Sequence, residues 1–187
     1  MKNKNKKELF IVEGQSAAST LRQAIGNSDQ IIHAIQGKLI NVAKATPKKV
    51  HENTECQKIF QLLACGKGSD CQPDQLNYSR ILILTDPDSD GSHSRALVLT
   101  LFDQYLKPLI DSGLVSVIIP PLFRMTWEDS GQENYAWSEQ ERLQLIQENE
   151  TVRDFIVTRF KGVAQFSREE CVRLLLHPET RKQIDIV

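Results

Sequence analysis

Short apolar runs alternate with helical patterns along most of the chain. Runs rich in branched residues predict buried strands at residues 9–12, 30–35, 81–84 and 115–119, and residues 123–127 continue in an extended form. The spacing of apolar residues predicts helices over residues 16–25, 54–64 and 92–111, with Ser16 and Thr54 as N-terminal caps. Strands that alternate with helices predict an α/β fold, a mostly parallel sheet with helices on both faces.

The last third of the chain is more polar and its periodicity is weaker. Ser138 and Ser167 each precede a Glu by three residues, the spacing of a capping box ahead of a short helix. We therefore expect a frayed, lysine-rich start at residues 1–7 and a main domain at residues 8–127. Residues 128–187 are expected to form an insert and a small helical tail that packs on the main domain.

Composition and charge exclude several classes of protein. The 187 residues are 40% hydrophobic, and they contain no apolar stretch near the ~20 residues of a membrane helix and no signal-peptide core. The four cysteines form no CxxC pair, so a reduced cytoplasmic environment is expected rather than a structural zinc site. The net charge is only −1, but basic and acidic residues are segregated along the chain. A local contact with a phosphate backbone therefore stays open, and no membrane partner is expected.

Carboxylates gather where two predicted strands end. Glu13 follows the first strand, and Asp86, Asp88 and Asp90 follow the strand at residues 81–84. In an open parallel sheet, ligands bind at the carboxyl ends of the strands. Three aspartates so close repel one another unless a cation neutralises them, and Mg²⁺ is a cation that carboxylates and phosphates bind together. The pattern predicts a Mg²⁺ site to which Glu13 adds a ligand or a proton acceptor.

Two other interpretations of the acidic loop stay open. Its spacing resembles the first half of a calcium-binding EF-hand loop, but the twelfth position from Asp86 is Leu97 rather than Glu. The second interpretation is a solvated acidic turn that stabilises the start of the next helix. Crowding of the three aspartates also predicts that, without metal, at least one titrates above the ~3.9 of an ordinary Asp.

Five short blocks follow one another in a fixed order. They are residues 13–17 (EGQSA), 37–45 (GKLINVAKA), 85–93 (TDPDSDGSH), 120–124 (PPLFR) and 160–162 (FKG). In this order they resemble the TOPRIM domain and C-terminal tail of the B subunits of bacterial type IIA topoisomerases, the family of DNA gyrase and topoisomerase IV. Any one block would be weak evidence for this resemblance, whereas all five blocks in the same order are specific to the family.

The resemblance implies a TOPRIM (Rossmann-like) fold and part of an ATP-dependent DNA strand-passage enzyme. In that family a tyrosine of the A subunit cuts both DNA strands reversibly, and one or two Mg²⁺ ions are held by the TOPRIM domain. Glu13 and Asp86 would hold the ion nearest the reacting 3′ oxygen, and Asp86 with Asp88 a second ion on the phosphate backbone. Asp90 would support this metal site. The implied catalytic residues are Glu13, Asp86 and Asp88, and the implied DNA contacts are Lys38, Lys44, His93, Arg124 and Lys161.

The same resemblance implies two partners, double-stranded DNA and the topoisomerase A subunit, in a heterotetramer of the bacterial cytoplasm. Gln15 and Ala43 stand where the family has acidic residues, and Gln165 ends a tail motif in which the family has Glu. These departures keep a second hypothesis open, a catalytically weakened paralogue that docks DNA and the A subunit. A third hypothesis, another TOPRIM enzyme such as a primase or nuclease, is disfavoured by Pro120-Pro121 and Lys161-Gly162.

The ATPase region of the family has no counterpart in these residues, and no glycine-rich ATP lid is present. We therefore expect a segment of a longer protein or a naturally truncated one. Alone, it is expected neither to hydrolyse ATP nor to cut DNA.

Overall fold

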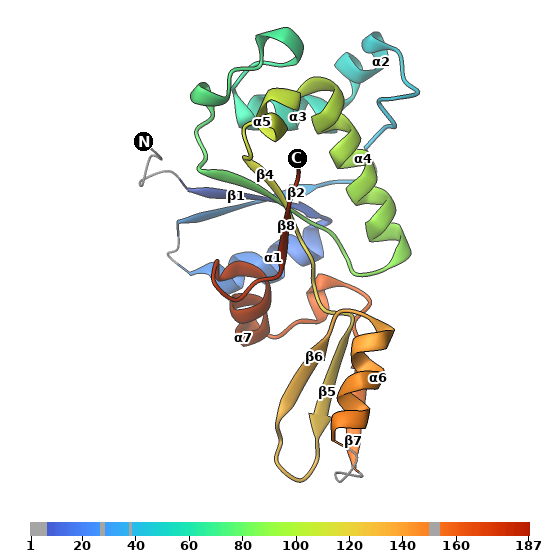
Figure 1. Cartoon of the computed structure of the whole chain (residues 1–187). Helices are drawn as coiled ribbons and strands as arrows, with labels where there is room; N and C mark the ends of the chain where they lie inside the picture. The colour runs from blue at the N-terminus through green and yellow to red at the C-terminus, as the bar shows by residue number, and fades with distance from the viewer. Residues whose placement is uncertain (1–6, 27–28, 38, 150–153) are drawn as a thin grey trace.

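A five-stranded sheet forms the centre of the computed structural model, which describes residues 7–26, 29–37, 39–149 and 154–187 (Figure 1). In spatial order its strands are β2 (Gln30–Ile35), β1 (Glu8–Glu13), β3 (Arg80–Leu84), β4 (Val115–Ile118) and β8 (Gln183–Asp185). The first four are parallel, and β8 pairs with β4 in the antiparallel sense. The predicted α/β fold with a mostly parallel sheet is confirmed.

Helices cover both faces of this sheet, as Figure 1 shows. One face carries α1 (Gln15–Ile25), α7 (Arg168–Glu170) and the π-helical turn Cys171–Leu176, and the other carries α2 (Pro47–Glu52), α3 (Thr54–Leu63), α4 (Ser89–Tyr105) and α5 (Lys107–Asp111). Successive side chains of a strand point to opposite faces, so Leu9 and Ile11 join the core under α3 and α4, whereas Phe10 and Val12 join the core under α1. A sheet covered on both faces explains why its strands are continuous apolar runs.

Two helices are capped by residues other than those predicted. α1 begins directly after Gly14, whose φ of 80° is left-handed, so Ser16 lies inside the helix and does not cap it. Asn53 rather than Thr54 caps α3, because the Asn53 side chain accepts a hydrogen bond from the N–H of Cys56. Where two good caps are adjacent in sequence, the direction in which the chain enters the helix decides between them.

A second, antiparallel sheet of three strands extends away from the first (Figure 1). It consists of β6 (Glu133–Ala136), β5 (Phe123–Trp127) and β7 (Phe155–Arg159), with α6 (Glu139–Glu148) after β6. The change of sheet thus falls between β4 and β5. The expected division into residues 8–127 and 128–187 stays a prediction, and residues 1–6 of the expected frayed start lie outside the described part.

Beyond the small sheet the chain returns to the main domain. Ser167 and Glu170 form the predicted capping box ahead of α7, and short 3₁₀ turns lie at Gly68–Asp70, Pro73–Gln75 and Val163–Gln165. Arg181 then donates two hydrogen bonds to the Glu8 carboxylate, at 2.6 and 2.7 Å, which joins the end of the chain to β1. Among the described helices, none has the length and apolar character needed to cross a membrane.

Candidate metal-binding site

Glu13 is the last residue of β1, and Asp86 lies two residues after the end of the neighbouring strand β3. β1 and β3 pair in parallel with Val12 opposite Leu84, so Glu13 and the segment that leads to Asp86 leave the sheet side by side. Burial raises the pKa of Asp86, and the nearby negative charge of Glu13 raises it further. The arrangement agrees with what the shared sheet edge predicted, while the role of these residues as metal ligands stays a prediction.

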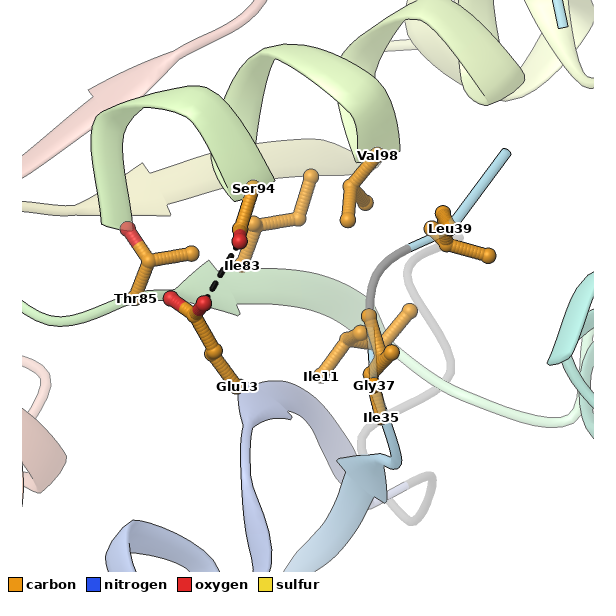
Figure 2. Close-up of a pocket in the computed structure, with 9 residues that line it drawn as sticks. All are labelled: Ile11, Glu13, Ile35, Gly37, Leu39, Ile83, Thr85, Ser94 and Val98. Atoms are coloured by element: carbon orange, nitrogen blue, oxygen red, sulfur yellow. Dashed lines mark hydrogen bonds between the residues drawn. The ribbon is translucent and has the colours of Figure 1, made fainter. Parts of the chain in front are cut away.

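Glu13 has one oxygen in a hydrogen bond and one without a partner. The Ser94 hydroxyl donates to Glu13 Oε1 at 2.5 Å, and Figure 2 shows this bond between the end of β1 and α4 above it. Glu13 Oε2 is buried, and no described residue forms a hydrogen bond with it; the same holds for Thr85 Oγ1. A buried carboxylate oxygen without a partner is costly, and a cation would satisfy it.

The tail of the chain contacts Asp86 directly. The backbone N–H of Val163 donates to Asp86 Oδ1 at 2.7 Å. Gly162 is so close that a Cβ there would lie 3.3 Å from both carboxylate oxygens. Burial raises the pKa of Asp86, the Val163 N–H opposes this, and the charges of Glu13 and Asp88 raise the pKa further. The pKa of Asp86 is thus raised, in the direction that crowding of the aspartates predicted, with burial rather than crowding as the largest cause.

Asp88 and Asp90 belong to the start of α4. Asp88 Oδ1 accepts a hydrogen bond from the N–H of Gly91 at 2.7 Å and so caps the helix, which begins at Ser89 rather than at the predicted residue 92. Asp88 and Asp90 are both exposed. The prediction was wrong about the helix start because an aspartate just after a proline offers its own side chain as the cap.

The carboxylates of the site belong to no closed cage of ligands in the described residues. In the described part of the chain, no three His, Cys, Asp or Glu side chains are grouped so that they could hold a metal ion. Mg²⁺, however, is commonly bound through one or two carboxylates and completes its coordination with water and substrate phosphates. The pair of Glu13 and Asp86, with an unsatisfied buried oxygen on Glu13, fits such an ion.

The residues expected to contact DNA differ in their exposure and in their partners. Lys44, His93 and Lys161 are exposed, and Lys44 lines a surface groove together with Lys49. Arg124 is instead paired inside the molecule. Its guanidinium lies 3.2 Å from Glu170 and 3.7 Å from Glu133. Lys38 lies outside the described residues.

Sequence reasoning missed two partners of the site. Ser94 carries no motif of its own, and its position on α4 became relevant only when the helix packed over β1. The Val163 N–H is a backbone group, and every residue except proline has one, so the residue type does not indicate that it contacts Asp86. The glycine at position 162 was the available indication, since glycine allows the close approach of a backbone to another group.

Asp86→Asn is expected to raise the melting temperature of the metal-free chain at pH 7. Because the pKa of Asp86 is raised in the folded state, the stability that its protonated form contributes is lost as pH rises through that pKa. Asparagine cannot ionise and keeps an oxygen for the Val163 N–H. The melting temperatures of the two proteins should converge as pH falls below about 4.

Circular dichroism melts between about pH 3.5 and pH 8 in a chelator would measure this difference. Added Mg²⁺ should stabilise the wild type only, because a ligand that binds the native state shifts the unfolding equilibrium. A metal-free wild type that is more stable than Asp86→Asn at pH 7 would contradict the prediction.

The open sheet has one acidic residue at the end of β1 and others after β3, and residues 8–117 match the Toprim domain family. The chain belongs to this family. It is 35% identical over 188 residues to the B subunit of DNA topoisomerase 4 from Staphylococcus epidermidis, and 36% identical over 184 residues to the B subunit of DNA gyrase from Thermotoga maritima. These alignments cover 99% and 98% of the chain, which spans 28% of the length of each relative.

Proposed function

We propose that the chain is the Mg²⁺-binding part of the B subunit of a type IIA DNA topoisomerase. In this role it supports the reversible cleavage and religation of double-stranded DNA by a tyrosine of the A subunit, in the bacterial cytoplasm. The observation that carries the proposal is the buried oxygen of Glu13 that has no hydrogen-bond partner among the described residues, at the end of the strand that pairs with the one before Asp86. ATP-dependent strand passage would belong to the complete enzyme.

The side chains of the site have distinct tasks in this proposal. Bound Mg²⁺ would stabilise negative charge on the attacked phosphate and on the leaving 3′ oxygen. Glu13 offers Oε2 to the ion because Ser94 holds Oε1, and Asp86 offers Oδ2 because Val163 holds Oδ1. In the proposal, Glu13 could instead accept the proton of the 3′-hydroxyl during religation.

Asp88 and Asp90 complete the metal site in the proposal. Asp88 uses one oxygen to cap α4, so its second oxygen is left for another ion on the phosphate backbone. Asp90, in the first turn of α4, would add negative charge beside that ion.

Exposed polar side chains would position the DNA. In the proposal, Lys44, His93 and Lys161 contact phosphates, which orients DNA without reading its sequence, and their exposure supports this role. Lys38 joins them in the proposal through the resemblance alone. Arg124 would contact DNA only through the part of its guanidinium that Glu170 and Glu133 leave exposed.

One observation favours a second candidate, a domain that docks DNA and the A subunit without effective metal binding. No group of three ligands is assembled in the described ranges. The departure at Gln165 does not support this candidate, because Gln165 Oε1 accepts hydrogen bonds from the N–H groups of Lys161 and Gly162 and so holds the loop that contacts Asp86.

Metal titration separates the two candidates. Mn²⁺ binding to the chain in the presence of a short nicked duplex, followed by electron paramagnetic resonance, should be at least about tenfold weaker in Asp86→Ala than in the wild type. Asp103→Ala is the matched control, because Asp103 lies on the same helix α4 but pairs with Lys107 on the surface. Equal affinity of the wild type and Asp86→Ala would favour the docking domain.

A further inference from the structure

We propose that Ser94 is a positioning residue that orients the Glu13 carboxylate for the metal, an inference that rests on the proposed function. Ser94 lies in the second turn of α4, 81 residues away from Glu13 in sequence, and its hydroxyl donates to Glu13 Oε1 at 2.5 Å. This distance is typical of a hydrogen bond between a hydroxyl and an ionised carboxylate. The bond connects α4 to the end of β1, as Figure 2 shows.

Other hydroxyls of α4 behave differently. Ser92 donates to the carbonyl of Asp88, and Thr100 donates to the carbonyl of Ala96, each four residues earlier in the chain. This is the usual bond of Ser and Thr inside a helix. Ser94 instead bonds to a side chain of another element, so its hydroxyl acts on the site and not on the helix.

The Ser94 bond decides which Glu13 oxygen is available. The last torsion of a Glu side chain is broad, so the carboxylate turns easily unless a partner holds it. Within the described residues, Ser94 is the hydrogen-bond donor to this carboxylate, and the other oxygen is buried without a partner. One hydroxyl therefore determines that Oε2 is the free oxygen.

The surroundings of Glu13 are mostly apolar, and Ser94 and Thr85 are the residues with hydroxyl groups that line its cavity. Glu13 and Ser94 line a small cavity of about 10 Å³, enough for roughly one water molecule. Apart from Thr85, the side chains that line this cavity with them are apolar, among them Ile11, Ile83 and Val98 (Figure 2). Without the Ser94 hydroxyl, the carboxylate gains room to turn, and the other hydroxyl lining the cavity is that of Thr85, which has no hydrogen-bond partner among the described residues.

A residue that forms a hydrogen bond with a metal ligand affects how tightly the metal is bound. Ligating carboxylates are themselves hydrogen-bonded in metal sites, and removal of such a partner typically weakens metal binding by roughly 10–100-fold. Asp86 has its own partner in the Val163 N–H. Because that group belongs to the backbone, Ser94 is the partner that substitution can remove.

Mn²⁺ alone is the probe for the test, with the whole chain and the nicked duplex described above. Ser94→Ala should weaken Mn²⁺ binding by about tenfold or more, and Ser94→Thr, which keeps the hydroxyl, should restore it. Thr100→Ala, the matched control, removes a hydroxyl of the same helix and should bind Mn²⁺ as the wild type does. Circular dichroism melts should show that both variants are folded at the temperature of the titration, so that a loss of affinity is not a loss of folding.

Glu13→Gln separates failure of this inference from failure of the proposed function. If Glu13→Gln loses Mn²⁺ and Ser94→Ala does not, the role of Ser94 is overturned and the metal site stands. If the wild type does not bind Mn²⁺, or Glu13→Gln binds it as the wild type does, both are overturned.

Crystal structures of the metal-free wild type and Ser94→Ala add a readout that is independent of metal. The Glu13 carboxylate should turn in the variant, and an unchanged orientation would overturn the inference.

Discussion

Gly91→Ala is expected to lower the free energy of unfolding by at least about 2 kcal/mol, although alanine is the better helix former. A Cβ at position 91 would lie 2.1 Å from the carbonyl oxygen of Asp86, and 2.8 and 2.9 Å from its carbonyl carbon and nitrogen. These are backbone atoms, which cannot rotate aside as a side chain would. The turn between Asp86 and Gly91 must therefore open, and Asp86 moves with it.

Urea unfolding of Gly91→Ala would measure the loss, with Ala96→Gly on the exposed side of α4 as the control. The control should lose only about 1 kcal/mol, the ordinary difference between the two residues in a helix. Mn²⁺ binding should fall in Gly91→Ala as well, because Asp86 is displaced. A Gly91→Ala protein as stable as the wild type would show that the close contact is absent in solution.

Arg181→Met is expected to cost about 3 kcal/mol of stability, near the lower end of what the removal of one partner from a buried ion pair costs. Only 2% of the Arg181 side chain is exposed, and its guanidinium bonds to both oxygens of Glu8 and to the carbonyl of Leu176. Methionine can replace the apolar stem but leaves the Glu8 carboxylate without this cation. The tail should then detach more easily from β1.

The dependence of this loss on pH identifies its cause. Burial would raise the pKa of Glu8, but the hydrogen bonds from Arg181 and Gln30 and the charge of Arg181 outweigh it and hold the pKa below its ordinary value. Stability from a lowered carboxyl pKa is present at neutral pH and is lost as pH falls through the folded-state pKa. The difference between wild type and Arg181→Met should therefore shrink below about pH 4.

Chemical denaturation at about pH 7 and pH 3.5 would test both statements. Arg173→Met is the control, since Arg173 is largely exposed and lies 3.9 Å from Glu133. Such a surface pair should contribute no more than about 1 kcal/mol. A loss for Arg181→Met that is as small as the control, or one that does not change with pH, would contradict the assignment.

The central strands were predictable because their burial is nearly complete. β1 and β3 are covered on both faces, and a strand in that position must be a short, continuous run of apolar residues. The helix starts were less predictable. Asn53 and Asp88 each lie next to other plausible caps, and the sequence alone does not tell which side chain reaches a free N–H.

The candidate site was predictable in its acids and not in their surroundings. Glu13 and Asp86 follow from the rule that parallel strands end at a common edge, which the chain order already contains. Arg124 has partners that its block did not indicate, because the fold pairs it with Glu170 and Glu133, while its DNA contact stays a prediction. An ion pair between residues 46 positions apart depends on packing that no local pattern records.

By itself, the sequence determined the class of fold, and it predicted the strand ends and the two acids of the candidate site. These follow from local patterns of apolar residues and from chain order, which act over a few residues at a time. Only the tertiary structure decided which oxygen of each acid is held and which is free. That choice depends on donors from α4 and from the tail loop, Ser94 and Val163, which reach the acids only after long-range packing.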